Sequence, residues 1–157
     1  MSEPIVEWLN QQQDSMVELL RDLVDIDSNS FDKAGVDRVG VRLTTFFDDN
    51  EIPHETIPLE EYGDAIRAVV SSGDGNQPIL LCGHRDTVFP TGEVEKRPFS
   101  IADGKAFGPG VADMKPGLVI NAFILAAFHK FGGHPNPLVG LFTGDEEIGA
   151  PASKDVI

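Results

Sequence analysis

The sequence has little cysteine and little positive charge, and each shortage excludes a class of protein. Cys82 is the single cysteine, so the chain cannot form an intramolecular disulfide, and we expect a reducing compartment. Lysine and arginine number 12 against 26 aspartates and glutamates, which gives a formal net charge of −14. Because binding to phosphates needs clustered basic residues, nucleic acid is not an expected partner.

Long hydrophobic runs are also absent. The longest nearly apolar run, residues 117–128, contains Asn121 and falls short of the roughly 20 residues that span a bilayer. The N-terminal residues lack a basic region followed by an apolar one, so no signal peptide is expected. We therefore predict a cytoplasmic protein with no membrane partner.

The residues that are present describe an ordinary globular domain. The 157 residues are 41% hydrophobic and 24% charged, which is enough to build one domain with a core. Apolar residues spaced three and four apart predict helices over residues 4–26, from Asp32 or Asp37 to Phe47, and over 115–131, with a further helix near Ala150. Apolar runs between turn residues predict strands over 54–59, 65–71, 78–82 and 137–143. This alternation predicts an α/β fold, a three-layer sandwich with a largely parallel central sheet.

Histidine and acidic residues stand where three predicted elements begin or end. His84 follows one strand, the pair Glu146-Glu147 follows another, and Asp113 precedes the helix over 115–131. In open α/β sheets such residues gather beyond the carboxyl ends of the strands, so we expect these four side chains to converge. Imidazole and carboxylate are ligand types that zinc prefers, and a spare carboxylate beside them can serve as a base.

Three motifs in this order resemble a family of zinc-dependent exopeptidases and deacylases. The motifs are His84-Arg-Asp-Thr-Val, Gly108-Pro-Gly-Val-Ala-Asp-Met-Lys and Gly144-Asp-Glu-Glu. The family includes glutamate carboxypeptidase, acetylornithine deacetylase, succinyl-diaminopimelate desuccinylase and aminoacylases. The resemblance covers residues 79–157, and the stretch beginning Lys96-Arg-Pro-Phe-Ser looks most like the glutamate carboxypeptidase branch.

The resemblance implies a role for each site residue. His84 would bind one zinc ion, Glu147 the other, and Asp113 would bridge the two. Glu146 would act as the general base and then as the acid, while Asp86 would hydrogen-bond the ring of His84 and orient it. Spacing alone leaves open which glutamate is the ligand. The implied cofactor is two Zn²⁺ per complete active site, with Co²⁺ as a substitute.

The resemblance also implies a longer parent protein. Residues 1–157 would be the N-terminal portion of the catalytic domain, and a lid domain that can form a homodimer would lie outside this chain. The remaining ligands, an acidic residue and a late histidine, would lie beyond Ile157. The Asp113–Met114 peptide bond would be cis. Pro116 stands where the family commonly has glycine, but the first turn of a helix tolerates proline.

The predicted reaction is hydrolysis of an amide bond in a small peptide or an N-acyl amino acid. A glutamate-type carboxypeptidase is the first interpretation and an N-acyl amino acid deacylase the second. With an incomplete ligand set, we expect the 157-residue chain alone to be inactive and poorly soluble.

Several other interpretations stay open. The chain could be a non-catalytic interaction fragment. Cys82 and His84 could form a nucleophilic pair, and Gly108-Pro-Gly110 resembles half of a phosphate-binding loop, although Pro109 breaks the pattern. We expect Asp145 to be a neighbour of the site rather than a ligand. The remaining histidines are expected on the surface; they are His54, His129 and His134.

Overall fold

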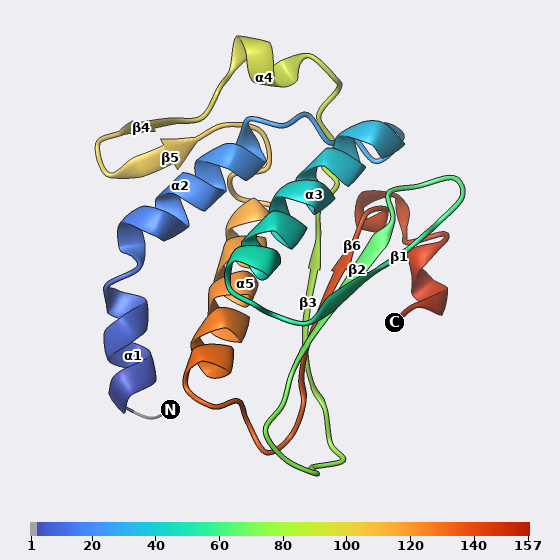
Figure 1. Ribbon diagram of the computed structural model, residues 1–157. Helices are drawn as coiled ribbons and strands as arrows, with labels where there is room; N and C mark the ends of the chain where they lie inside the picture. The colour runs from blue at the N-terminus through green and yellow to red at the C-terminus, as the bar shows by residue number, and fades with distance from the viewer. Residues whose placement is uncertain (1–2) are drawn as a thin grey trace.

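The computed structural model describes residues 3–157, which form a four-stranded sheet, a small two-stranded sheet and the helices around them (Figure 1). The helices are α1 (Glu3–Asn10), α2 (Gln13–Val24), α3 (Lys33–Asp49), α4 (Glu93–Lys96) and α5 (Lys115–Lys130). The strands are β1 (His54–Ile57), β2 (Ala65–Val70), β3 (Ile79–His84), β4 (Ser100–Ala102), β5 (Lys105–Phe107) and β6 (Leu138–Thr143). Two 3-10 turns end the chain, η1 (Glu146–Ile148) and η2 (Ser153–Asp155).

Among residues 3–157 the main sheet is mixed, whereas the sequence predicted a largely parallel one. Its strand order is β1-β2-β6-β3, in which β3 and β6 run parallel while β1–β2 and β2–β6 are antiparallel. A parallel return needs a crossover of roughly a dozen residues or more. The connections 58–64 and 71–78 are shorter than that, so the chain reverses direction at each. The connection from β3 to β6 contains α5 and is long enough to restore the parallel direction.

The α/β class is confirmed, but residues 3–157 form two layers rather than three. The helices α1, α2, α3 and α5 lie on one side of the sheet (Figure 1). They share one core because α5 contacts α1, α2 and α3 as well as strands β2, β3 and β6. The other face of the sheet is partly open: Leu80 of β3 is 47% exposed, and Cys82 is also exposed.

The core lies between the helices and the inner face of the sheet. Alternate residues of the strands point toward the helices, among them Ala68 on β2 and Phe142 on β6. Aromatic rings join the layers, with ring centroids 4.8 Å apart for Phe46 and Phe123 and 5.6 Å apart for Phe47 and Phe142. Burying each such ring stabilises the fold by about 1.5–3 kcal/mol.

Two predicted helices differ in the structure. The helix expected over residues 4–26 is interrupted, because the backbone of Gln11 and Gln12 forms turn-type bonds to Trp8 and Leu9 at 3.1 and 3.0 Å. Near Ala150 the chain forms only the short η2, since the positive φ of Ala150 (53°) is incompatible with a continuing helix.

The α3 N-terminus is capped by Asp32, whose side chain accepts a hydrogen bond from the amide of Gly35 at 3.0 Å. This selects Asp32 over Asp37 as the start of the helix. None of the helices described in residues 3–157 is both long and apolar enough to cross a membrane.

Candidate metal centre

The parallel pairing of β3 with β6 brings the two strand-end motifs together. His84, the last residue of β3, lies beside Thr143, the last residue of β6, so the segments that follow them leave the sheet at the same edge. The start of α5 lies there too, because the backbone amide of His84 donates to the sulfur of Met114 at 3.3 Å. Three segments distant in sequence therefore meet at one place, as the sequence predicted.

His84, Asp113 and Glu147 form a group that could hold a metal ion. Each offers one ligand atom, and these atoms lie within 4.8 Å of one another. The Nε2 atom of His84 lies 3.2 Å from Asp113 Oδ1 and 3.6 Å from Glu146 Oε2. The Asp113–Met114 peptide bond is cis, as the resemblance implied. Among the described residues, no other histidine takes part in such a group.

The side chain of Asp86 contacts His84 and the backbone of both Glu146 and Glu147. Its carboxylate is fully buried, and its Oδ1 lies 3.4 Å from Nδ1 of His84. The same carboxylate accepts hydrogen bonds from the amides of Glu146 (3.2 Å) and Glu147 (3.1 Å), and from the hydroxyl of Ser30 at 2.7 Å. A hydrogen bond of this carboxylate to the His84 ring was predicted; the ring nitrogen Nδ1 lies nearer to the backbone carbonyl of Asp86, at 3.1 Å. The contacts to Ser30 and to the two amides were missed, since nothing local in the sequence signals a partner 56 residues away.

The charges of the cluster suit a cation. Burial by itself would lower the pKa of His84, but hydrogen bonds to Asp86 and the charges of Asp86 and Glu146 outweigh it and raise the pKa to about 9. Burial, together with the nearby carboxylates, raises the pKa of Glu147 despite the opposing charge of His84. Negative charges gathered this closely repel one another, and a divalent cation would relieve that repulsion. The nitrogen and oxygen donors present fit zinc.

Asp145 lies next to this cluster but is not a member of it. Its buried side chain accepts hydrogen bonds from the amides of Ala152 at 2.8 Å and Ser153 at 3.1 Å, and so holds the C-terminal turn in place. The expectation that Asp145 is a neighbour rather than a ligand agrees with this geometry.

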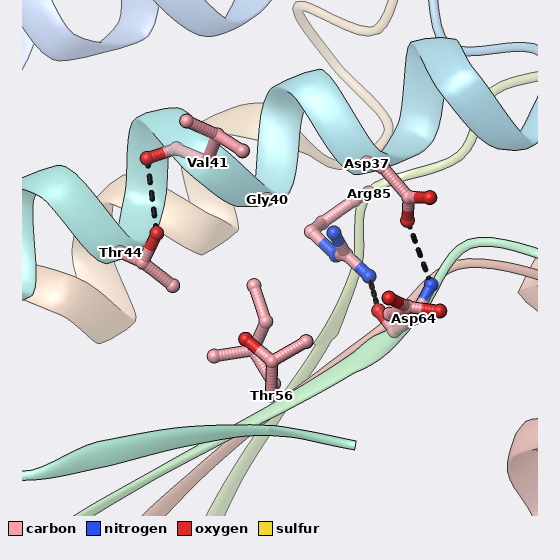
Figure 2. Close-up of a pocket in the computed structure, with 8 residues that line it drawn as sticks. Asp37, Gly40, Val41, Thr44, Thr56, Asp64 and Arg85 are labelled. Carbon is pink, nitrogen blue, oxygen red and sulfur yellow. Dashed lines mark hydrogen bonds between the residues drawn. The ribbon is translucent and has the colours of Figure 1, made fainter. Parts of the chain in front are cut away.

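Arg85, between His84 and Asp86, was not singled out from the sequence and is 1% exposed. Its guanidinium donates a hydrogen bond to the carbonyl oxygen of Val36 at 3.1 Å. It donates another to the carbonyl oxygen of Asp64, which Figure 2 shows. Gly40 of α3 lies against it, and a Cβ there would collide with the guanidinium. Arg85 therefore joins α3 and the loop before β2 to the segment that carries the predicted ligands. The one feature of the sequence that could have indicated this role is that Arg85 is a charged residue directly after an apolar strand.

The two other chemical interpretations lose support. Although the side chain of Cys82 reaches the surface, partial desolvation of its thiol and the charge of Glu146 outweigh the hydrogen bond from the Gly83 amide and raise its pKa, which disfavours the thiolate that a nucleophile needs. The turn at Gly110 leaves little room for a phosphate, because Thr87 and Lys115 pack against it. The ammonium of Lys115 is itself buried and donates to the carbonyl of Ile26 at 2.8 Å.

Comparison with known proteins identifies the family. Residues 80–157 match the family model described as Peptidase family M20/M25/M40. The chain belongs to this family. The matched residues of this M20/M25/M40 chain include His84, Asp86, Asp113, Glu146 and Glu147.

Two curated relatives extend the match toward the N-terminus. Carboxypeptidase G2 of Pseudomonas sp. is 29% identical over 154 residues, which are 93% of this chain and 36% of that protein. Acetylornithine deacetylase of Salmonella arizonae is 34% identical over 147 residues, which are 88% of this chain and 38% of that protein. The M20/M25/M40 chain thus spans well under half of the length of these relatives.

Solved structures share the fold. Human carnosine dipeptidase 1 superposes with a TM-score of 0.81 at 18% identity, covering 98% of this chain and 36% of its own. An M20 family metallo-carboxypeptidase from Sulfolobus solfataricus has a TM-score of 0.75 at 18% identity, covering 90% of this chain and 33% of its own. The M20/M25/M40 chain therefore has the architecture of about one third of each of these chains.

Proposed function

We propose that the protein is a zinc-dependent hydrolase of amide bonds, and that residues 1–157 are the N-terminal portion of its catalytic domain. The observation that supports this most directly is the convergence of His84, Asp113 and Glu147, whose ligand atoms lie within 4.8 Å of one another. Glu146 stands beside them, with its Oε2 atom 3.6 Å from Nε2 of His84 and its side chain 58% exposed.

The proposed ligands divide between two zinc ions. His84 would hold one ion and Glu147 the other, and Asp113 would bridge them because its carboxylate has two oxygens on a short arm. Three protein residues are too few to complete two sites, so further ligands would come from residues outside this chain. When bound, zinc supplies Lewis-acid polarisation of the scissile carbonyl and makes water more acidic.

Residues of this chain would transfer the proton that the attacking water loses. Glu146 would accept it from the attacking water at a carboxylate oxygen and then deliver it to the nitrogen of the leaving amine. Asp86 would keep the proton of the His84 ring on Nδ1, which leaves the Nε2 lone pair free for the metal. The amides of Glu146 and Glu147 bonded to Asp86 would fix the backbone from which both carboxylates project.

The proposed substrate is a small peptide or acyl amino acid from which a C-terminal residue such as glutamate is released. The similarity to carboxypeptidase G2 over 93% of this chain supports this choice. The second candidate is deacylation of an N-acyl amino acid, which the 34% identity to acetylornithine deacetylase favours. A cytoplasmic location and a homodimer formed through a lid domain stay predictions.

Metal titration tests the proposal. We expect Co²⁺, used as a coloured substitute for Zn²⁺, to bind the chain and to be displaced by Zn²⁺. His84→Ala should weaken binding by at least about tenfold, the lower end of what even an outer partner of a metal ligand costs. His129→Ala, at the distant end of α5, is the matched control and should bind like the unmodified chain. Equal binding by the His84→Ala variant would refute the site.

Activity of the chain alone is expected to be negligible. Each ion would have two protein ligands here, one short of the usual catalytic three. The assay would follow glutamate release from an acylglutamate and, in parallel, cleavage of an N-acetyl amino acid with excess zinc. Zinc-dependent turnover that disappears in Glu146→Ala would contradict this expectation, and would mean that a second chain or water completes the sites.

A further inference from the structure

A groove leads from the metal centre toward the β4–β5 hairpin, and the proposed catalytic residues do not account for it. A cavity of about 280 Å³ begins at Asp113 and Glu147. A second cavity, of about 490 Å³, lies on the side of the hairpin. The two share Gly108 and Val111 in their walls, so they adjoin, and together they are called the groove.

The part of the groove next to the metal centre is apolar. Its walls include Val88, Phe89 and Val111. Val88 is 62% exposed, although it directly follows the buried segment that carries His84 and Asp86. Apolar side chains that line a concave site beside a few polar groups are typical of a surface that a ligand covers.

The far end of the groove is cationic. Lys96 and Arg97 line the second cavity, and its lining contains no carboxylate. Glu93 pairs with both, at 3.3 Å to Lys96 and 2.7 Å to Arg97, but it does not line the cavity. The guanidinium of Arg97 also lies over the ring of Phe89, 5.0 Å from its centroid, and so links the cationic end to the apolar part. In a chain with a net charge of −14, a cavity lined by two cations and no carboxylate is a local exception.

We propose that this groove binds the acyl side of the substrate and selects acyl groups that are apolar beside the scissile amide and end in an anion. The inference rests on the metal-dependent amide hydrolysis proposed above, since that reaction places the scissile bond at Asp113 and Glu147. A peptide with a free N-terminal ammonium would bring a cation toward Lys96 and Arg97 and would bind less well.

The test uses three N-benzoylglycines that differ only in the para substituent, which is carboxylate, methyl or aminomethyl. Each is titrated into the zinc-loaded, ¹⁵N-labelled chain while amide NMR signals are followed, at concentrations where light scattering shows a monomer. The carboxylate probe should bind most tightly and shift the amides of Gly108, Val111 and Arg97. Arg97→Gln should weaken that probe by about two- to fivefold, the range of an exposed ion pair, and leave the methyl probe unchanged.

Lys105→Gln is the matched control. Lys105 is a cation on strand β5, near the groove, but its side chain does not line the groove. This substitution should alter neither probe. Equal affinity for all three probes, or a preference for the aminomethyl probe, overturns the proposal. Zinc binding is measured on the same sample, so a failure of the metal centre is seen separately. If zinc binds through His84 and no groove amide shifts, the groove inference alone is wrong.

Discussion

Asp86 is the residue through which the parts of the candidate metal centre are connected. Its buried carboxylate contacts the His84 ring and accepts hydrogen bonds from the backbone amides of Glu146, the proposed base, and Glu147, the proposed ligand. Burial would raise the pKa of Asp86, but its hydrogen bonds from His84, Ser30 and the two amides lower it, so the carboxylate stays charged. Because each of these hydrogen bonds needs the charged carboxylate, we expect substitutions of Asp86 or of its donors to disturb the candidate metal centre.

The first prediction concerns Asp86→Asn. An amide would present an N–H group to donors and would remove the negative charge that orients His84, so Co²⁺ affinity should fall about 10- to 100-fold. Ser30→Ala removes one hydrogen bond to the same carboxylate and should lower the free energy of unfolding by roughly 1.5–3 kcal/mol. Spectroscopic Co²⁺ titration and urea unfolding measure the two effects. Unchanged metal affinity in Asp86→Asn would refute the role given to Asp86.

A second prediction at this scale concerns acid stability. Burial raises the pKa of Asp64, but hydrogen bonds from Lys33 and the amide of Leu59, with the charges of Lys33 and Arg85, bring it below its ordinary value. The unfolded chain therefore takes up this proton at higher pH than the folded one. The stabilisation is present above the ordinary pKa and is lost as pH falls through the lowered one.

Asp64→Asn keeps the shape of the side chain and removes the proton-binding group. In EDTA, the unmodified chain should lose more unfolding free energy between pH 6 and pH 3 than Asp64→Asn does. Urea midpoints at the two pH values measure this difference, and parallel losses in the two proteins would show that Asp64 contributes nothing.

At the scale of elements, the turn before α5 decides where Asp113 lies. Gly110 has a φ of 76°, and an added Cβ would lie 2.9 Å from Thr87 Cγ2 and 3.2 Å from Lys115 Cδ. Gly104, in the β4–β5 turn, has a similar φ of 71°, but nothing lies within 4 Å of its Cβ position. The two glycines therefore share a backbone conformation and differ in crowding.

Alanine at each position separates these two effects. Gly104→Ala should cost about 1–2 kcal/mol, the penalty of a left-handed conformation alone. Gly110→Ala should cost about 1–3 kcal/mol more, because packed neighbours must move as well. Urea unfolding measures the free energy of unfolding of both variants. Equal losses would show that the residues around Gly110 move aside without a loss of stability.

At the scale of the whole molecule, β3 is an edge of the sheet among the described residues, and its outer surface is apolar. It pairs with β6 on one side, while Ile79 is 43% and Leu80 47% exposed. Unpaired backbone groups beside exposed apolar side chains favour strand-to-strand association. This agrees with the expectation that the isolated chain is poorly soluble.

Leu80→Lys should therefore reduce association of the chain. A charge on an edge strand opposes pairing with a second strand, so light scattering should show a lower average mass at the same concentration. Val41→Lys is the matched control, since Val41 is 65% exposed but lies on helix α3. If both variants lower the mass equally, general surface charge and not the edge of β3 is responsible.

The sequence by itself determined the α/β class and most element positions, and it singled out the residues that the fold gathers into the candidate metal centre. Those features depend on local information: periodicity sets helices and strands, and three short motifs carry His84, Asp113 and the two glutamates. Tertiary structure alone decided the strand directions, the single helical layer, the burial of Arg85 and the contact of Ser30 with Asp86. These depend on which distant segments pack together, because short connections reverse the strands and a buried charge is tolerated only where distant carbonyl oxygens bond it.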